Sequence, residues 1–449
     1  MNIYMNTLFN AANFFNAFDI INVVMLIAIL IVYTALNFSA IVGLVSKPKK
    51  YPNAKKNHKY AVLIAARNEE KVIGNLIASI KKQDYPSELV DVFVVADNCT
   101  DNTYSVAKNA GAIAYERFNK DMKGKSYALD YLLSRINEDY ADAGYEAYFI
   151  FDADNLLDKN YIKEMNKAYD SGVKICTSFR DSKNFGDSWV SANSSMMFYM
   201  ECTMTHQTRT KNNIGTYVSG TGYYVDANII KENGGWIHHL IIEDVEFSVD
   251  SAIKGYKTMY CADAVFYDEQ PIKLKDSYTQ RLRWAKGGHQ CFGKYVWSLL
   301  KRVFTGKNKM TCCGLLIHVC PVPVIAFFWT VLYSVVAFIE GIVIDNSVYA
   351  GLYNVLTKGI LIIGIFAIFF LFYTVVIMAK NHKRMNVSIY KKIWYSFTYP
   401  FYMVVFLIAS VVSLFAKVTW KAIPHVSDKS IEEVVKEWKS FFLHWKMNL

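Results

Sequence analysis

Two pairs of acidic residues have the spacing expected of groups that bind a cation and accept a proton. Asp152 and Asp154 are one residue apart and follow the apolar run 147–151 directly. Two carboxylates spaced in this way can hold a hard divalent cation together with a diphosphate. Glu243 and Asp244 follow another apolar stretch, where a neighbouring acid and partial burial would raise a carboxyl pKa toward that of a general base. The alternatives are loop or helix-capping aspartates for the first pair and surface acids for the second.

A basic and aromatic run supplies groups suited to a diphosphate and a sugar ring. Arg283 can bind a diphosphate bidentately, and Trp284 offers a flat apolar face on which a sugar can pack. Lys125 opens the helix expected before the 147–151 run, where a lysine suits a phosphate. Asp97 ends an earlier apolar run and would face the same crevice. An interfacial membrane anchor is the alternative for the Arg-Trp cluster, and an Asx turn is the alternative for Asp97.

Strands and helices in alternation would bring these residues to one edge of a sheet. Short apolar runs predict strands over 60–65, 90–96 and 147–151, and helical periodicity predicts helices over 72–80 and 126–136. This alternation indicates a largely parallel sheet, whose ligands bind at the carboxyl ends of the strands. The polar clusters that carry Arg67, Asp97 and Asp152 fall at those ends.

Long apolar runs predict an integral membrane protein. Of the 449 residues 53% are hydrophobic, and charge-free runs cover 20–46, 310–339, 359–379 and 393–416. A bilayer crossing needs roughly 20 residues. The stretch of ordinary charge between the first and second runs is long enough for one soluble domain. Eight cysteines without a C-x-x-C pair suit a reducing environment better than a disulfide scaffold.

The distribution of charge predicts an orientation and argues against nucleic-acid binding. The net charge is +10, but the excess lies in the membrane-flanking segments 47–59, 285–309 and 380–392 and not on one face. By the positive-inside rule these segments and the soluble domain are cytoplasmic. The loop 345–357 contains no lysine or arginine and is predicted to be external.

Two amphipathic segments could lie in the membrane surface. Residues 291–309 carry an apolar stripe flanked by lysines, and residues 431–445 repeat the pattern after a Ser430-x-x-Glu433 capping box. Docking on the protein's own soluble domain is the alternative for both segments.

In this order, Asp97, Asp152-x-Asp154, Glu243-Asp244 and Gln280–Trp284 resemble the membrane-embedded inverting family 2 glycosyltransferases. That family includes cellulose, hyaluronan, chitin and poly-N-acetylglucosamine synthases. The resemblance covers about residues 60 to 290 and implies an α/β GT-A (Rossmann-like) fold with helical membrane segments. It also implies a nucleotide diphosphate sugar, usually a UDP-sugar, and Mg²⁺ or Mn²⁺ as the cofactor.

The resemblance assigns roles to individual residues. Asp244 would be the general base beside Glu243, and Asp154 would hold the metal. The nucleotide sugar would contact Arg67, Glu69, Asp97, Lys125, Asp152 and Arg283, and the acceptor would contact Gly220, Thr221, Gln280 and Trp284.

Val418-Thr419-Trp420-Lys421 resembles the V-T-x-K gating-loop element of cellulose synthases, which closes over bound UDP. The aromatic expected two residues before the valine is replaced by Ala416, so an interfacial anchor is the alternative. If all the later apolar runs cross the membrane, this segment lies outside. We therefore expect the run 393–416, which contains Pro400, to be interfacial or re-entrant, leaving three crossings, or four if it spans.

The expected organisation is a transmembrane helix over 1–46, a cytoplasmic GT-A domain over 47–290 and an interfacial helix over 291–309. Membrane helices follow over 310–417, and a cytoplasmic gating-like loop and amphipathic helix over 418–449. The leading hypothesis is a processive synthase of the plasma membrane that extends a β-linked, glucan-type polymer from UDP-glucose and translocates it. The alternative is a transferase that adds one sugar to a lipid. A homodimer or an accessory export subunit would be needed if the few membrane helices do not form a channel.

Overall fold

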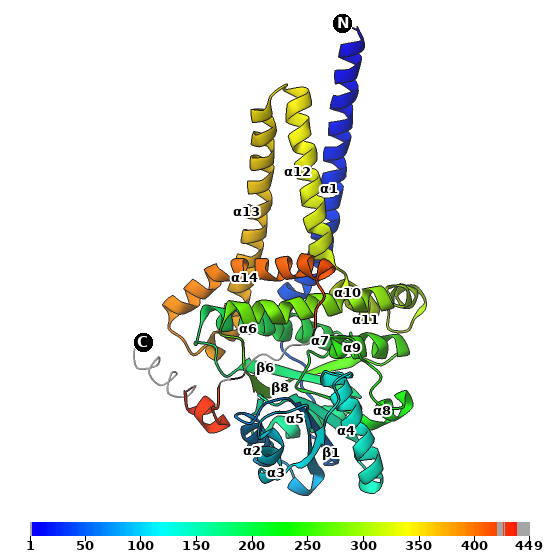
Figure 1. Ribbon diagram of the computed structural model, residues 1–449, viewed down its shortest axis with the longest axis vertical. Coiled ribbons are helices and arrows are strands. Elements are labelled where there is room, and N and C mark those ends of the chain that lie inside the picture. The colour runs from blue at the N-terminus through cyan, green and yellow to red at the C-terminus, as the bar shows by residue number, and fades with distance from the viewer. Residues whose placement is uncertain (1, 420–424, 426, 438–449) are drawn as a thin grey trace.

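Three long helices stand side by side on one side of an α/β domain (Figure 1). The computed structural model describes residues 2–419, 425 and 427–437. The long helices are α1 (Asn2–Val45), α12 (Val322–Ile344) and α13 (Val348–Asn381). The Tyr333 hydroxyl donates to Asp19 at 2.9 Å and the Trp329 indole N–H donates to Asn22 at 2.9 Å, which fastens α12 to α1.

The α/β domain is built on one mixed sheet with the strand order β3-β2-β1-β4-β7-β6-β8-β5. The strands are β1 (Tyr60–Ala66), β2 (Val90–Asp97), β3 (Ile113–Arg117), β4 (Ala147–Asp152), β5 (Leu156–Leu157), β6 (Ile175–Ser182), β7 (Tyr223–Asp226) and β8 (Thr258–Asp268). The three predicted strands are confirmed as β1, β2 and β4, which run parallel with Val62 opposite both Val92 and Phe149. The sheet is less parallel than expected, because β7 pairs antiparallel with both β4 and β6.

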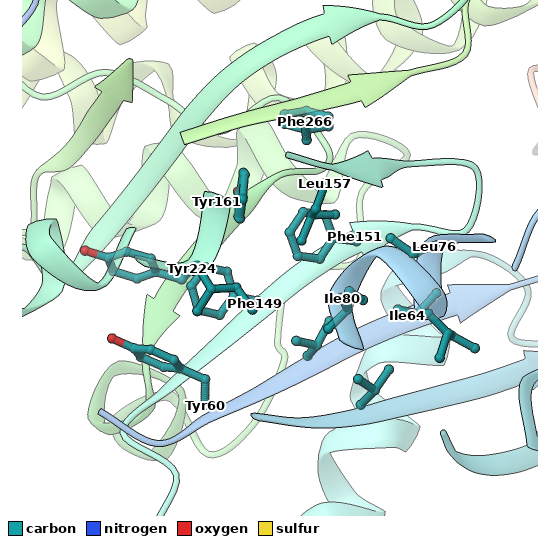
Figure 2. Packing of buried hydrophobic residues seen from close by; sticks show 14 of the residues in the cluster. Tyr60, Ile64, Leu76, Ile80, Phe149, Phe151, Leu157, Tyr161, Tyr224 and Phe266 are labelled. Atoms are coloured by element: carbon teal, nitrogen blue, oxygen red, sulfur yellow. The ribbon is translucent and has the colours of Figure 1, made fainter. Parts of the chain in front are cut away.

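Helices cover both faces of the sheet because successive strand residues point to opposite sides. Val62 and Ile64 of β1 belong to one core with α2 (Ile73–Lys81), α3 (Thr103–Asn109) and α5 (Tyr161–Asp170). Figure 2 shows this core, where aromatic side chains of β1, β4 and β7 pack together. Ala61 and Leu63 face a second core with α4 (Lys125–Asp139), α8 (Ala227–Asn233) and α9 (Glu243–Lys254).

A layer of helices lies between the sheet and the three long helices (Figure 1). It comprises α6 (Trp189–Met200), a π-helical turn (Glu201–His206), α7 (Gln207–Lys211), α10 (Leu274–Thr305), α11 (Lys309–Val319) and α14 (Ile389–Phe415). The expected separate helix over 291–309 is instead the second half of α10. The expected span 310–339 is also divided, because the chain leaves α11 before Pro321, which cannot continue a helix.

The helix α14 lies across the ends of α12 and α13 that are nearest the α/β domain, and it runs alongside α10 (Figure 1). The hydroxyls of Ser277 and Tyr402 lie 3.0 Å apart, and Lys286 donates to the Ser413 carbonyl at 3.0 Å. By length and composition four segments could cross a membrane: Asn10–Ile29, Val322–Ile344, Ile363–Arg384 and Ile389–Phe415. Both ends of α14 nevertheless lie on the side of the α/β domain.

The amphipathic segments pack on the α/β domain through their apolar stripes. In α10, Leu299 is fully buried in a cluster with Ile242 and Val249, whereas Trp297 is 79% exposed. In the C-terminal segment Val434 packs against Leu156 and Tyr267. The predicted capping box is present, since Ser430 N–H donates to Glu433 at 2.7 Å and Glu433 N–H donates to Ser430 Oγ at 3.3 Å.

Candidate active site

A single cavity of about 770 Å³ lies at the carboxyl ends of β1, β2 and β4 and continues to the foot of α12. Thirteen of the predicted site residues line it: Arg67, Glu69, Asp97, Lys125, Asp152, Asp154, Gly220, Glu243, Asp244, Gln280, Arg283, Trp284 and Val418. Thr221 and Thr419 are described but do not line the cavity, and Trp420 and Lys421 lie outside the described residues. The cavity therefore lies at the edge of the sheet where the sequence predicted the site.

The loops after β1 and β2 form one end of the cavity. Glu69 N–H donates to Thr103 Oγ1 at 2.8 Å, which ties the first loop to α3. Asp97 is buried and accepts a hydrogen bond from Arg117 Nη1 at 2.5 Å. A second nitrogen of Arg117 donates to the Met122 carbonyl at 2.9 Å, so the guanidinium fixes the orientation of Asp97.

The Asp152-Ala153-Asp154 turn is held by backbone groups and by Lys125. The Lys125 ammonium forms an ion pair with Asp152 and donates to the Gly220 carbonyl at 2.6 Å. Burial lowers the pKa of Lys125, but Asp152 and Glu243 raise it by more, so the lysine stays charged. Asp154 is buried and accepts from Glu269 N–H at 3.1 Å.

Thr221, predicted to contact the acceptor, lies beneath this turn and does not line the cavity. Its hydroxyl accepts from Asp152 N–H at 2.9 Å and donates to the Asn155 side chain. Gly220 is on the cavity wall with φ +80°, and a Cβ there would lie 3.7 Å from Asp244 Oδ2. A side chain at this position would touch the predicted general base at ordinary contact distance, and the positive φ would strain the backbone.

A further acid and base lie behind the turn. Arg180 Nε and Nη2 donate to Asp268 Oδ2 at 2.9 and 2.6 Å, and its Nη1 donates to the Ser219 carbonyl at 3.0 Å. Burial raises the pKa of Asp268 to about 6 against the effect of Arg180. Both residues line the cavity, yet neither belongs to a motif that the sequence marked.

Glu243 and Asp244 begin α9 and face the cavity. Burial raises the pKa of Glu243 to about 8, with Asp244 adding to the rise, and burial also raises the pKa of Asp244. Among the described residues neither carboxylate forms an ion pair. A buried carboxyl with a raised pKa and no ion-pair partner is suited to accept a proton near neutral pH.

Gln280, Arg283 and Trp284 share one face of α10, as residues three and four apart do on a helix. Arg283 lies near Glu243 and Asp152, which raise its pKa against a stronger lowering by burial. Trp284 packs edge to face on Phe198, with ring centres 6.0 Å apart. Gln280 Oε1 is buried and forms no hydrogen bond with the residues that the structure describes.

Arg281, between these residues in the sequence, is turned away from the cavity. Its guanidinium is fully buried and lies 4.1 Å from the ring centre of Tyr402. Arg281 therefore joins α10 to α14. Of the two arginines in the motif, Arg283 lines the cavity and Arg281 packs between these helices.

The arm of the cavity that lies toward α12, α13 and α14 is mostly apolar. It lies between the α11–α12 junction, α13 and α14, and its wall includes Ile317, Val319, Pro321, Val322, Phe369, Phe370, Met403 and Phe406. Glu201 lines the cavity, is raised in pKa by burial and accepts from Ser219 Oγ at 3.0 Å. One cavity therefore joins acidic strand ends to an apolar wall.

The C-terminal segment returns to the acidic end of the cavity. Val418 and His425 both line it, and His425 Nδ1 lies 3.2 Å from Glu69 Oε2. Burial lowers the pKa of His425, but Asp154 and Glu69 raise it by more, to about 10. His425 was not predicted, although it follows the marked run 418–421 by only four residues.

Asp152 and Asp154 supply the hard oxygen ligands that Mg²⁺ and Mn²⁺ prefer. Within the described part of the chain no three His, Cys, Asp or Glu side chains are grouped closely enough to form a complete metal site. Mg²⁺ is usually bound by one or two carboxylates and completed by substrate phosphates, so the donor set fits such an ion.

Curated relatives include a probable glycosyltransferase of Bacillus subtilis, 24% identical over 57% of this chain and 61% of its own length. A beta-monoglucosyldiacylglycerol synthase of Synechocystis is 24% identical over 52% of this chain and 48% of its own. A poly-beta-1,6-N-acetyl-D-glucosamine synthase of Staphylococcus epidermidis is 25% identical over 53% and 57%. The chain thus spans about half to three fifths of the length of these relatives.

A mannosyltransferase of Pyrobaculum calidifontis, solved with GDP-Man and Mn²⁺, has a similar fold. The two chains superpose with a TM-score of 0.54 at 16% identity, over 87% of this chain and 97% of the other. This likeness confirms the predicted GT-A-like architecture. The family model described as Glycosyltransferase like family 2 matches residues 58–287, just over half of the sequence, and the chain belongs to that family.

Proposed function

We propose that the protein is an inverting glycosyltransferase that moves a sugar from a nucleotide diphosphate sugar to an acceptor held at the membrane. The observation that carries the proposal is the single cavity, which joins the acidic strand ends to an apolar wall beneath α12, α13 and α14. A donor with a charged diphosphate and an acceptor with an apolar part could bind to it together.

The donor would occupy the acidic end of the cavity. Arg67 and Glu69, which follow β1, and Asp97, which ends β2, line the cavity and would contact the nucleoside. Lys125 and Arg283 both lie near Asp152 and would hold the diphosphate, which Asp152 alone would repel. UDP-glucose is the donor we favour.

Asp154, with Asp152, would hold Mg²⁺ or Mn²⁺. When bound, such an ion neutralises the negative charge that develops on the departing diphosphate. Lys125 and Arg283 act on the same charge, and Thr221 keeps the Asp152 backbone in place through a hydrogen bond of 2.9 Å.

The reaction would be a single displacement. Asp244 removes the proton from an acceptor hydroxyl as that oxygen attacks the anomeric carbon and the bond to the diphosphate breaks. One displacement inverts the anomeric centre, so an α-linked donor gives a β-linked product. No group is placed as a covalent nucleophile in this scheme.

The apolar arm favours a lipid acceptor. Alkyl chains are stabilised by apolar walls such as those formed by Val319, Val322, Phe370 and Phe406. A carbohydrate in the same arm would leave many hydroxyl groups without hydrogen bonds, at a cost of about 1–3 kcal/mol each. Transfer of one sugar to a lipid is therefore the function that the cavity supports best.

A processive polysaccharide synthase is the second candidate, and it is favoured by a different observation. Trp284 and Gln280 line the cavity on the helix that carries Arg283, and a tryptophan face beside the general base suits the terminal sugar of a polymer. This candidate needs a route through the membrane, from α1, α12 and α13 or from another subunit.

The proposed placement has α1, α12 and α13 crossing the membrane and α14 lying in its inner surface. The exposed residues Tyr390, Trp394 and Phe401 of α14 would face lipid. Val418 follows α14 and lines the cavity, which requires the end of α14 to be on the catalytic side. The α/β domain would then be cytoplasmic, in a plasma membrane.

The test is to purify the protein in detergent and to supply labelled UDP-glucose, UDP-N-acetylglucosamine and GDP-mannose separately, with Mg²⁺ or Mn²⁺. The assay includes 1,2-dioleoylglycerol as a lipid probe, and the products are partitioned and sized. A product with one or two sugars in the organic phase supports the lipid acceptor. A large water-soluble polymer supports the processive candidate, and no transfer from any donor contradicts both.

A further inference from the structure

We propose that Arg180 is a positioning residue that holds the acceptor wall of the cavity at a fixed distance from the Asp-x-Asp turn. The acceptor wall comprises Phe198, Ser219 and Trp284, which all line the cavity. The inference rests on the proposed function, in which the wall contacts the acceptor and the turn contacts the donor. It assigns a role to a buried arginine that belongs to none of the motifs marked in the sequence.

One side of the guanidinium is connected to the Asp-x-Asp turn. Arg180 Nε and Nη2 donate to Asp268 Oδ2 at 2.9 and 2.6 Å. The other oxygen, Oδ1, accepts from Asn155 Nδ2 at 2.7 Å, and the Asn155 side-chain oxygen accepts from Asp152 N–H at 3.2 Å. Asp268 and Asn155 therefore connect Arg180 to the backbone of the turn through an unbroken series of hydrogen bonds.

The other side of the guanidinium contacts the acceptor wall. Nη1 donates to the Ser219 carbonyl at 3.0 Å, and the guanidinium carbon lies 3.8 Å from the ring centre of Phe198. A cation over an aromatic face is attracted by the ring. Phe198 packs in turn on Trp284, with ring centres 6.0 Å apart. One rigid group therefore contacts both the donor side and the acceptor side of the cavity.

The local structure of β6 directs Arg180 toward the cavity. The pairing of β6 with β8 shifts register between Ser178 and Phe179, just before Arg180, and such irregularities re-aim side chains beside functional sites. Phe179 points to the opposite face of the strand, where it joins a core with α13. The side chain of Arg180 is 12% exposed and that of Asp268 is 3% exposed, so water competes little for the bonds between them.

The contacts of Arg180 exceed what neutralising Asp268 requires. A lysine ammonium beside Asp268 would supply the charge, whereas only a planar guanidinium presents fixed donors to a carboxylate and a carbonyl while it packs on a ring. These additional contacts fix the distance between the wall and the turn. Because a displacement of about 1 Å can lower a rate by about 100-fold, this distance would govern transfer to the acceptor.

The test is Arg180→Lys, which keeps a positive charge beside Asp268 and removes the guanidinium plane. The detergent-purified full chain is assayed with Mn²⁺, with 1,2-dioleoylglycerol and with UDP-glucose, UDP-N-acetylglucosamine and GDP-mannose in turn. The kcat of transfer should fall at least about tenfold, whereas KM for the lipid should stay within about threefold. Donor hydrolysis and UDP affinity should change by less than about twofold, because Asn155 and Thr221 still accept from Asp152 N–H.

Arg384→Lys is the matched control. Arg384 Nη1 donates to the buried Asp181 at 2.6 Å, and its guanidinium carbon lies 4.0 Å from the ring centre of Phe179. This arrangement has the same chemistry as the contacts of Arg180, but none of its three residues lines the cavity. Arg384→Lys should leave the kcat of transfer within about twofold of the unmodified protein.

A double-mutant cycle tests whether Arg180 acts through the acceptor wall. Trp284→Ala removes the ring on which Phe198 packs, so Arg180→Lys should cost no more than about threefold in that background. Full additivity of the two losses would show that Arg180 acts elsewhere and would overturn the inference. Arg180→Gln combined with Asp268→Asn removes both buried charges together, and it should show the same loss of transfer if Arg180→Lys does not fold.

Transfer by Arg180→Lys within about threefold of the unmodified rate would show that Arg180 only neutralises Asp268, and would overturn the positioning role. A tenfold or greater loss of UDP affinity would make Arg180 a ligand of the diphosphate, by about 1.4 kcal/mol, and would also overturn it. In both cases the unmodified protein still transfers sugar, so the proposed function stands. Absence of transfer by the unmodified protein would instead contradict the proposed function, and the positioning role with it.

Discussion

The cavity contains two pairs of acids with the same chemical groups and different surroundings. Asp152 and Asp154 end a strand, where Lys125 pairs with the first and Glu269 N–H donates to the second. Glu243 and Asp244 begin a helix, Glu243 is buried and Asp244 half-buried, and neither forms an ion pair with the described residues. The first pair has a cation in direct contact, whereas Lys125 acts on the second pair only through space and its effect is outweighed by burial.

This difference suits the first pair to bind a metal ion and the second pair to accept a proton. A carboxylate beside a cation remains ionised and can hold a metal and a diphosphate. A buried carboxyl without a cation takes up a proton at a higher pH and can remove one from a hydroxyl. The surroundings, and not the residue type, therefore distinguish ligand from base. Exchanging or removing members of the pairs tests this.

The largest effect is expected for Asp244→Asn. An amide cannot accept the acceptor proton, so kcat should fall by about 10²–10⁴-fold. UDP binding, measured by calorimetry, should stay within about twofold, because the substitution leaves Lys125 and Arg283 in place. A matching loss of UDP affinity would contradict the division of labour between the pairs.

Asp154→Asn should have the next largest effect, about 10²-fold on kcat/KM, because a neutral amide is a poorer ligand for a hard cation. Adding EDTA to the unmodified protein should stop turnover, and excess Mn²⁺ should restore it. The Asp154→Asn variant should need more Mn²⁺ for half-maximal rate. Activity that survives complete chelation would remove both aspartates from metal binding.

Much of the acidic end of the cavity could be predicted from the sequence because it depends on local pattern. Strands β1, β2 and β4 follow from short apolar runs, and the acids at their ends had to meet at one edge. The helix that begins at Glu243 was not predicted, and Glu243 and Asp244 were recognised only from the apolar stretch before them and from the family resemblance. Each of the recognised features depends on residues within one element and its immediate neighbours.

The remaining features depend on contacts between distant segments. Nothing near Arg180 indicates that it would pair with Asp268, 88 residues away, and nothing near Thr221 shows that it supports Asp152. His425 meets Glu69 across 356 positions. The continuity of α10 through residue 290 was also missed, because a change of composition there resembles a boundary between elements.

Trp284→Ala tests whether the tryptophan ring holds the acceptor beside the base. Loss of the ring face should lower transfer to the acceptor by roughly tenfold, since such packing contributes about 1 kcal/mol or more. Hydrolysis of the donor should change by less than about twofold. Trp297→Ala, at an exposed position of the same helix, is the matched control and should leave both rates unchanged. Equal losses of transfer and hydrolysis would argue against acceptor packing.

The smallest effect is expected on stability, and it measures the cost of ionising Glu243 in the folded protein. The pKa of Glu243 is raised from 4.5 to about 8 in the folded protein, so folding is favoured while the group is protonated. That contribution is complete below pH 4.5 and is lost as the pH rises through 8. Above pH 8 the buried charge is a cost, and Glu243→Gln should raise Tm by at least about 2 °C.

Asp250, on the same helix, provides the control of opposite sign. Burial raises the pKa of Asp250, but hydrogen bonds from His238 and Lys254 lower it by more. Its ionised form therefore stabilises the folded protein above pH 3.8, and that stability is lost as the pH falls below this value. Asp250→Asn should lower Tm at the pH where Glu243→Gln raises it. If both variants lower Tm, then the charge of Glu243 is compensated in the folded protein. Glu243 would then resemble Asp152, whose charge Lys125 compensates, and would not be a carboxyl with a raised pKa.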